Sequence, residues 1–353
     1  MSVLPFVSVM IPVRNEAASI RACLESVLAQ DYPPDRFEVL VVDGASTDES
    51  AQVVGRYARR TDRVRLLENP RRIVPSALNI AIRAARGDIV MRVDGHTRIA
   101  PDYMRVGVET LKRTGADNVG GPMRPVGGGL VGDAIALATS SRFGIGSYFH
   151  FGRAETEVDT VYMGMYPRAV FEHAGLFDEE MVRNQDDEFN YRLRKAGGRV
   201  VLAPAMHSVY QNRQSLRALA KQFAQYGFWK VRVVQKHPRQ TSVRHFIPPA
   251  FVLAGVGLLM ASPWLWQARA AALLLGTTYA GSVGVVAARL AHTNGWRFLL
   301  PVAAAFVTLH LSWGAGFVLG LGRFATRWFR SETPPPQLRV PAELHWQRPA
   351  AGP

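Results

Sequence analysis

The segment from Ile247 to Gly322 constrains this chain most, because its 76 residues contain no acidic residue and no lysine. Its only charged residues are Arg269, Arg289 and Arg297. The buried helical core of a soluble domain is the alternative interpretation, but such a core rarely excludes acidic residues over this length. Residues 247–322 are therefore predicted to be a transmembrane region.

Three apolar runs divide this region, at about 247–266, 270–288 and 298–322. Each is close to the ~20 residues that cross ~30 Å of hydrocarbon. Tryptophans stand at or near their ends, where aromatic belts form; these are Trp264, Trp266, Trp296 and Trp313. About three transmembrane helices are expected.

Residues 211–246, just before this region, combine basic residues with an apolar stripe. Arg213, Arg217 and Lys221 recur every four residues, and Leu216, Leu219, Phe223 and Tyr226 fall on another face of a helix. Basic residues and aromatics beside apolar segments favour a helix in the headgroup layer. A solvated helix packed on a sheet is the alternative.

The basic run before Ile247 also predicts that the N-terminal part is cytoplasmic. Three crossings would then place Arg323, Arg327 and Arg330 on the outside, against the positive-inside bias. Either one segment is re-entrant or the bias is overridden. Residues 323–353, a basic stretch followed by a proline-rich one, are expected to be disordered.

A length of 353 residues suggests two folded units, and a single cysteine excludes an intrachain disulfide framework. The net charge of +14 suits nucleic acid, an anionic membrane surface or a phosphorylated substrate. The apolar third favours the membrane. The basic residues gather next to it and form no separate basic face with aromatic stacking, so no nucleic-acid partner is expected. The N-terminal apolar run has no preceding basic residue, which predicts a buried strand and no signal peptide.

Residues 1–210 alternate between strand and helix periodicities, which predicts an α/β fold with a mostly parallel sheet flanked by helices. The expected strands are 7–13, 37–42, 64–67, 88–93, 160–163 and 200–203; the expected helices are 16–30, 46–60, 73–85 and 186–196. Ligands on such a sheet bind at the carboxyl ends of the strands.

Polar residues follow three expected strands. Asn15 and Glu16 come after strand 7–13, which contains Pro12; Asp43 comes after strand 37–42; and Asp94 and His96 come after strand 88–93. Asp43 is a candidate to bind a ribose or base, with a helix N-cap as the alternative. Asp94-Gly-His96 is a candidate site for Mn²⁺ or Mg²⁺ bridging to a diphosphate, with an ordinary turn as the alternative.

Gln185 is followed by three acids at 186–188, at the start of an expected helix. Acids in a first turn are stabilised by the helix dipole, which is the simplest explanation. The crowding of three carboxylates would also raise the pKa of one of them, which favours a general base at this position.

Five ordered blocks over about residues 6–205 together resemble the inverting family 2 glycosyltransferases of the GT-A fold. They are 9–16, 41–48, 87–96, 164–178 and 185–197. Asp94-Gly-His96 and the membrane segments are most similar to succinoglycan-type glucosyltransferases that extend lipid-linked sugars. The Gln-x-x-Arg-Trp signature of processive synthases is missing.

This resemblance implies a role for each matched position. Asp186 is implied to be the catalytic base, and Asp94 and His96 to hold the metal. Gln185 replaces the usual Glu before the base, and His96 replaces the usual second Asp. The implied nucleotide-binding residues are Pro12, Asn15, Glu16, Asp43 and Asp94; weaker candidates for acceptor or phosphate contacts are Gln185, Arg72 and Trp229.

The expected function is transfer of a sugar from a nucleotide-diphosphate sugar, such as a UDP-hexose, to a hydroxyl of a lipid-linked saccharide. The metal-dependent enzyme would be an integral protein of the inner or plasma membrane, in contact with its lipids, and would serve polysaccharide or glycoconjugate biosynthesis. One alternative is transfer to a polyprenyl phosphate. A second is a non-enzymatic membrane binding or scaffolding protein. A dinucleotide oxidoreductase would need Gly-x-Gly-x-x-Gly after the first strand, where Pro12-Val-Arg-Asn-Glu16 stands.

Overall fold

The computed structural model describes residues 4–145, 148–150, 152–329 and 333–338. The chain forms two compact units, each described by itself. Unit 1 consists of residues 1–124, 148–210 and 333–353, and unit 2 of residues 125–147 and 211–332. Unit 1 thus contains the predicted catalytic, nucleotide-binding and metal-binding residues, and unit 2 contains the predicted membrane region.

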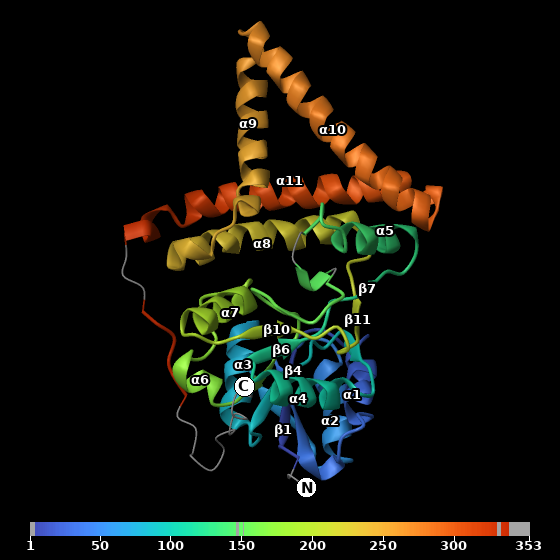
Figure 1. Cartoon of the computed structure of the whole chain (residues 1–353), viewed down its shortest axis with the longest axis vertical. Coiled ribbons are helices and arrows are strands. Elements are labelled where there is room, and N and C mark those ends of the chain that lie inside the picture. Colours follow the sequence, from blue (N-terminus) through green and yellow to red (C-terminus); the bar gives the residue numbers. More distant parts are fainter. Residues whose placement is uncertain (1–3, 146–147, 151, 330–332, 339–353) are drawn as a thin grey trace. The chain divides into compact units, whose positions relative to one another are not determined.

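Unit 1 is built on an eight-stranded sheet in the order β3-β2-β1-β4-β9-β6-β10-β8 (Figure 1). β1, β2, β3 and β4 are parallel, β9 runs antiparallel to β4 and β6, and β8 runs antiparallel to β10. The strands are β1 Val7–Val13, β2 Phe37–Asp43, β3 Val64–Glu68, β4 Ile89–Arg92, β6 Asn118–Gly120, β8 Thr156–Glu157, β9 Met165–Pro167 and β10 Val200–Leu202. Outside this sheet, β5 (Thr97–Ile99) runs antiparallel to β11 (Ser208–Gln211).

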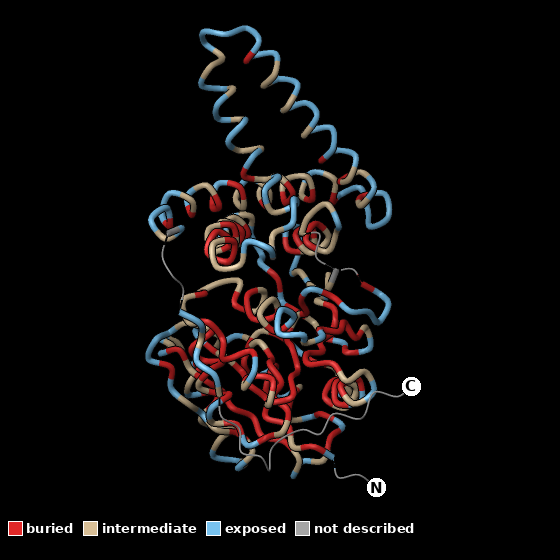
Figure 2. Tube along the Cα trace, turned by 60° about the vertical axis from the view of Figure 1, so that its left-hand side comes forward, coloured by how far each residue is buried: buried red, intermediate tan, exposed pale blue. Residues whose placement is uncertain are grey.

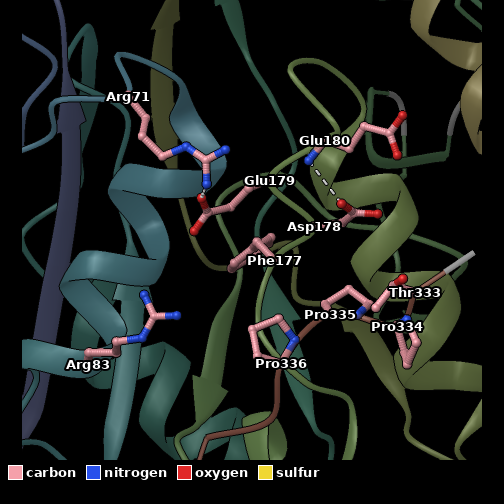
Figure 3. Close-up of a pocket in the computed structure, with 10 residues that line it drawn as sticks. All are labelled: Arg71, Arg83, Phe177, Asp178, Glu179, Glu180, Thr333, Pro334, Pro335 and Pro336. Carbon is pink, nitrogen blue, oxygen red and sulfur yellow. Dashed lines mark hydrogen bonds and ion pairs between the residues drawn. The ribbon is translucent and has the colours of Figure 1, made fainter.

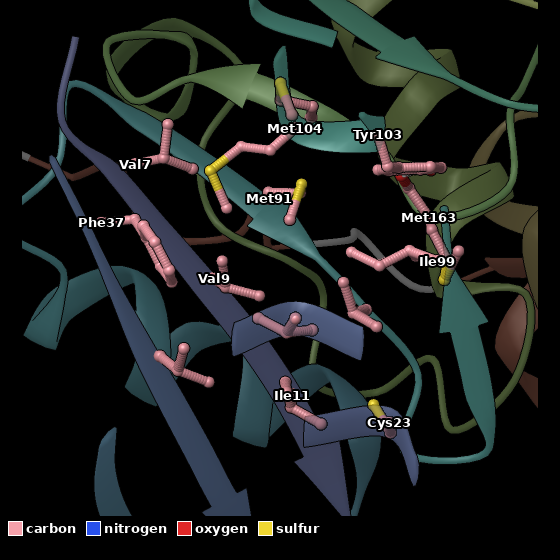
Figure 4. Close-up of a cluster of buried hydrophobic side chains, with 14 of the residues drawn as sticks. Val7, Val9, Ile11, Cys23, Phe37, Met91, Ile99, Tyr103, Met104 and Met163 are labelled. Atoms are coloured by element: carbon pink, nitrogen blue, oxygen red, sulfur yellow. Dashed lines mark hydrogen bonds between the residues drawn. The ribbon is translucent and has the colours of Figure 1, made fainter. Parts of the chain in front are cut away.

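Both faces of this sheet are buried, as the continuous apolar runs of a mostly parallel sheet require. On β1, Val9 and Ile11 enter one apolar cluster, and Met10 enters the other. Figure 4 shows part of the first cluster, in which Cys23 of α1 lies near Ile11. The helices of unit 1 are α1 Ile20–Leu28, α2 Ser50–Ala58, α3 Val74–Ala84, α4 Tyr103–Thr114, α6 Val170–His173 and α7 Gln185–Lys195, with short 3-10 turns at Pro34–Arg36 and Tyr148–His150.

One predicted strand, at 160–163, is wrong. The strand of this region is β9, at Met165–Pro167, between β4 and β6. Met163 has a φ of 50°, in the left-handed region, which an extended strand excludes. The apolar residues at 161 and 163 are buried as expected, but they belong to the loop that leads into β9.

Unit 2 is helical apart from a two-residue strand, β7 (Pro125–Val126). Its helices are α5 Leu130–Thr139, α8 Leu216–Lys236, α9 Ile247–Ala261, α10 Trp266–Asn294 and α11 Leu299–Arg323, with 3-10 turns at Pro238–Gln240, Val243–His245, Trp296–Phe298 and Ala325–Phe329. Within this unit α8 and α11 lie side by side, and α9 and α10 form a hairpin that projects from them (Figure 1). Figure 2 shows that this hairpin is largely exposed.

Two helical segments of the described chain are long and apolar enough to cross a membrane, Trp266–Asn294 and Trp296–Arg323. α9 is apolar but has only 15 residues. All three expected apolar runs are thus helices, and α10 extends beyond the expected run at both ends.

The described part of the tail, residues 333–338, belongs to unit 1. The backbone N–H of Leu176 donates to the carbonyl of Pro336 at 2.8 Å, and the N–H of Leu338 donates to the carbonyl of Phe171 at 3.1 Å. Leu338 packs against an apolar cluster of the sheet. The expectation of disorder covers residues 323–353, of which 330–332 and 339–353 lie outside the described residues.

Candidate active site

The loops after β1 and β2 are joined by a set of hydrogen bonds. The Asn15 backbone N–H donates to Oγ of Ser46 at 2.9 Å, and Oδ1 of Asn15 accepts from the N–H of Thr47 at 2.8 Å. Both carboxylate oxygens of Asp43 accept from Ser46. The parallel pairing of Val13 with Asp43 places these loops at the same end of the sheet.

Asp43 is not the N-cap of the following helix, which was the alternative interpretation. α2 begins at Ser50 rather than at 46, and its N-cap residue is Glu49. The turn before it is closed by Asp48, whose Oδ1 accepts from the backbone N–H of Ser50 at 3.0 Å. The half-buried carboxylate of Asp43 therefore shapes the loop beside Asn15.

Glu16 and His96 form a pair between the loops that follow β1 and β4. Nδ1 of His96 lies 3.0 Å from Oε1 of Glu16, and a carboxylate can only accept here, so Nδ1 carries the proton. Gly95 lies close to this pair: a Cβ there would lie 3.3 Å from Cγ2 of Val13 and 3.6 Å from Cγ of Glu16. The His96 ring also contacts the edge of the Tyr210 ring, with centroids 5.2 Å apart.

Arg92 links the two most important predicted acids. Its Nε donates to Oδ1 of Asp94 at 2.8 Å, and its Nη1 donates to Oδ1 of Asp186. The guanidinium is 9% exposed, against 13% for Asp94 and 33% for Asp186. Burying a charge is unfavourable unless it is paired, and here one cation serves two carboxylates.

The two carboxyl groups have opposite pKa shifts. Burial favours the neutral form of Asp94, but its interaction with the Arg92 guanidinium, and to a lesser extent with His96, outweighs burial and holds its pKa below the ordinary value. Burial raises the pKa of Asp186; Arg92 opposes this rise, and the charges of Asp94 and Asp187 add to it. A carboxyl pKa raised towards neutrality suits a general base.

α7 positions Asp186 at its first turn. The helix begins at Gln185, after Asn184 in the left-handed region with a φ of 60°. Its inner side is buried through Glu188, Phe189 and Leu193. The half-buried Asp186 is therefore held on a helix whose other side belongs to the core.

The weaker candidates have less support from their surroundings. Gln185 is buried at 7% exposure. Arg72 is exposed, with a φ of 60°, and its carbonyl accepts from Arg14 at 3.4 Å. Trp229 lies on α8 in unit 2, where its ring packs against Phe228 and Phe324. Their contacts with acceptor or phosphate stay predictions.

A pocket of about 570 Å³ opens elsewhere in unit 1 (Figure 3). It contains none of the predicted site residues. Arg71 and Glu179 form an ion pair at its wall, and the tail residues Thr333–Pro336 line the other side. Its lining is consistent with a groove occupied by the chain's own tail.

The donor set for a metal consists of Asp94 and His96, with Glu16 behind the imidazole. The described residues contain no group of three or more His, Cys, Asp or Glu side chains arranged to hold an ion. A hard cation can nevertheless be bound by one or two side chains plus substrate phosphates. The bond from Nδ1 to Glu16 leaves the lone pair on Nε2, as in many histidine ligands. These residues fit a metal ion that would be bound mainly by the phosphate oxygens of a substrate.

Sequence reasoning missed Arg92 and the role of Glu16. Arg92 precedes Asp94 by two residues on an extended segment, so both side chains share a face. That spacing was visible in the sequence and indicates the Arg92–Asp94 pair. The pairing of Arg92 with Asp186 joins residues that are 94 apart, and no local pattern reveals it.

Comparison with known proteins finds relatives of this chain both in sequence and in fold. Residues 8–175 match the profile of the family described as Glycosyl transferase family 2. The succinoglycan biosynthesis protein ExoA of Rhizobium meliloti is 32% identical over 314 residues, covering 88% of this chain and 93% of ExoA. A dolichyl N-acetyl-alpha-D-glucosaminyl phosphate 3-beta-D-2,3-diacetamido-2,3-dideoxy-beta-D-glucuronosyltransferase of Methanococcus voltae is 29% identical over 239 residues, covering 65% of this chain and 74% of that protein.

Among solved structures, the mannosyltransferase PcManGT of Pyrobaculum calidifontis, in complex with GDP-Man and Mn²⁺, matches with a TM-score of 0.60. It is 23% identical, and the match covers 91% of this chain and 88% of that one. The family profile and the curated relatives define a glycosyltransferase, and the fold is of the GT-A type. The chain belongs to glycosyl transferase family 2, and its activity lies in glycan biosynthesis.

Proposed function

We propose that this chain is a metal-dependent inverting glycosyltransferase. It moves a hexose from a UDP-sugar to a hydroxyl of a lipid-linked saccharide at the cytoplasmic face of the membrane. The observation that carries the proposal is the pair of contacts from Arg92 to Asp94 and Asp186. They bring Asp94, which follows β4 and would bind the metal at the donor diphosphate, beside Asp186 of α7, which would take the proton of the acceptor hydroxyl.

Asp186 acts as the general base in this proposal. Its carboxylate takes the proton from the acceptor hydroxyl, the acceptor oxygen bonds to the anomeric carbon, and the bond from that carbon to the diphosphate breaks. The raised pKa of Asp186 increases its basicity, while Arg92 opposes this rise and favours the ionised form that acts as the base. Attack from the face opposite the diphosphate inverts the anomeric centre.

The donor lies along the loops after β1, β2 and β4. Pro12, Asn15, Glu16 and Asp43 surround its base and ribose. Glu16 also contacts His96, next to the diphosphate. Asp94 and His96 would hold Mn²⁺ or Mg²⁺, and the bound metal would offset the charge that develops on the leaving diphosphate. Arg92 neutralises Asp94 before the donor arrives.

The acceptor is proposed from the relatives and from unit 2. The name of the Methanococcus voltae relative includes a dolichyl phosphate sugar, and that of the Rhizobium meliloti relative includes succinoglycan. The long apolar helices of unit 2 suit a protein held in the membrane where such acceptors reside. The exposed Arg217 and Lys221 of α8 suit the anionic surface of a membrane.

A binding screen followed by product analysis tests this proposal. Full-length protein is heated with UDP-glucose, UDP-N-acetylglucosamine or GDP-mannose, each with Mn²⁺, Mg²⁺ or a chelator. One UDP-hexose is expected to raise the unfolding temperature only when a metal is present, because a bound donor stabilises the folded state. That donor is then incubated with a lipid-linked saccharide and, separately, with polyprenyl phosphate.

A new glycosidic bond of inverted configuration on a saccharide hydroxyl supports the proposal. A sugar attached only to the phosphate oxygen would replace it by the polyprenyl-phosphate alternative. Absence of any stabilising nucleotide sugar would favour a binding or scaffolding protein.

A further inference from the structure

The last described segment of the chain, residues 333–338, is docked on unit 1. Residues 334–336 line the cavity of about 570 Å³ together with Arg71 and Phe177 (Figure 3). Leu338 packs against an apolar cluster of the sheet. We call residues 333–338 the tail segment. Its contacts show which part of unit 1 it holds in place.

The composition of the tail segment suits docking in one conformation. Proline fixes φ, so three prolines in a row lose little conformational freedom on binding. Proline also lacks a backbone N–H, so this stretch offers only carbonyls. Accordingly, the carbonyl of Pro336 accepts from the N–H of Leu176 at 2.8 Å. An N–H is supplied after the prolines by Leu338, which donates to the carbonyl of Phe171 at 3.1 Å.

The stretch bound by the tail segment also lies against α7. Gly175 has a φ of 74°, in the left-handed region that favours glycine. A Cβ at this position would lie 3.1 Å from the carbonyl oxygen of Pro335 and 3.4 Å from Nη1 of Arg192. Residue 175 is therefore approached closely by the tail segment and by a side chain of α7.

Arg192 binds this stretch to α7 through its guanidinium. Nη1 donates to the carbonyl of Ala174, and Nη2 donates to that of Leu176 at 2.8 Å. Nε and Nη2 also donate to the two carboxylate oxygens of Glu188, at 2.6 and 2.8 Å. The side chain of Glu188 is 1% exposed and that of Arg192 is 13% exposed. A buried ion pair adds little stability over an apolar pair of similar volume, so its main effect is to fix the geometry of α7 on residues 174–176.

Aromatic packing joins the same stretch to α7 a second time. The ring of Phe177 stacks on that of Phe189 of α7, with centroids 4.6 Å apart. The ring of Phe171 lies 5.2 Å from that of Phe189. Leu338 packs against the cluster to which these three rings belong. The tail segment thus contacts the residues on which α7 rests.

α7 also carries Asp186, six residues before Arg192. We propose that the tail segment is a positioning element for Asp186: it fixes residues 171–177, and these fix α7 and hence the direction of the Asp186 carboxylate. This inference rests on the base assignment made under Proposed function. The residues proposed to hold the donor lie on the loops after β1, β2 and β4, whereas the tail segment binds residues 171 and 176. Its release is therefore expected to lower turnover and to leave donor affinity unchanged.

Release of the tail segment in the full chain tests this proposal. Leu338→Asp places a charge at an apolar contact, and the exposed Gln337→Asp adds the same charge as the matched control. A chain that ends at residue 332 is the second variant, because it lacks the segment altogether. Turnover and the donor KM are measured at a temperature at which thermal unfolding shows every variant to be folded. Hydrogen exchange followed by mass spectrometry reports on residues 171–178 and 185–195 without requiring activity.

Leu338→Asp and the shortened chain are expected to turn over at least about tenfold more slowly, since a misplacement of ~1 Å can cost about 100-fold. The donor KM should stay within about twofold of wild type. Backbone N–H groups of residues 171–178 and of α7 should exchange faster, and Gln337→Asp should match wild type in every measurement. Leu338→Asp combined with Asp186→Asn should be no slower than Asp186→Asn alone, because the tail segment acts through that carboxylate.

Unchanged turnover of the shortened chain, or unchanged exchange of its α7, would overturn the proposal and leave the tail segment with a stabilising role only. The shortened chain decides where it and Leu338→Asp differ. A loss of turnover that persists in full when Asp186→Asn is already present would overturn the proposal as well, because the segment would then act elsewhere. Failure of the proposed reaction is recognised separately, as turnover of Asp186→Asn at the wild-type rate, and hydrogen exchange then still reports whether the tail segment fixes α7.

Discussion

At the scale of single residues, the proposed sugar transfer depends on Arg92, whose guanidinium pairs with two carboxylates. Arg92 is buried between Asp94 and Asp186 and stabilises the ionised form of each. The two acids nonetheless differ, since the pKa of Asp94 is lowered and that of Asp186 is raised. In the proposed reaction, Asp94 is the ionised group that would bind the metal, and Asp186 is the more basic group that would accept the proton.

The rate of transfer should therefore fall at low pH as Asp186 becomes protonated. Because its pKa is raised, the fall begins at a higher pH than for an ordinary aspartate. Arg92→Gln removes the charge that opposes this rise, so the acid limb of the pH–rate profile should move to higher pH. Transfer rates measured from pH 4 to 9 check this. An unmoved limb would show that Asp186 does not govern the profile; Arg60→Gln, on the surface, is the control.

Glu16 should act on the metal through His96. Glu16→Gln weakens the hydrogen bond that fixes Nδ1 as the protonated nitrogen. Loss of such a partner typically lowers metal affinity about 10- to 100-fold. Titration of Mn²⁺ in the presence of the donor measures the change. The exposed Glu68→Gln is the matched control, and equal affinities for the two variants would remove this role from Glu16.

At the scale of elements, much of the fold could be predicted from the sequence, and the exceptions have physical causes. The apolar runs of β1, β2 and β4 identify a sheet buried on both faces, which fixes where Asn15, Asp43 and Asp94 emerge. The antiparallel insertion of β9 could not be predicted, because its three residues form a strand only by pairing with β4 and β6. The contact of α7 with β4 through Arg92 is likewise tertiary.

Helix packing in unit 2 gives a prediction at this scale. Gly316→Ala places a Cβ against the carbonyl of Ala224 and should force α8 and α11 apart, lowering the unfolding temperature by several degrees. Gly276→Ala on α10 meets no atom within 4 Å and should leave that temperature unchanged or slightly higher. Thermal unfolding in detergent compares the two. Equal effects would contradict the close approach of α8 and α11.

At the scale of the whole molecule, the tail closes a path that begins and ends on unit 1. A chain that ends at residue 332 loses the hydrogen bonds with Leu176 and Phe171 and the packing of Leu338. It should be less stable by about 1–2 kcal/mol, which lowers the unfolding temperature by a few degrees. A chain that ends at residue 338 keeps these contacts and should match the full chain. If the two truncations behave alike, the tail does not stabilise unit 1.

The central claim is that Asp186 is the base of a glycosyl transfer whose donor is held elsewhere in the same site. It is tested most directly by measuring turnover and donor affinity for Asp186→Asn, with Asp187→Asn as the matched control. The account predicts a turnover at least about 100-fold lower for Asp186→Asn, the usual contribution of a general base. Donor affinity should stay within about twofold, and Asp187→Asn should remain close to wild type. Turnover of Asp186→Asn at the wild-type rate would contradict the account.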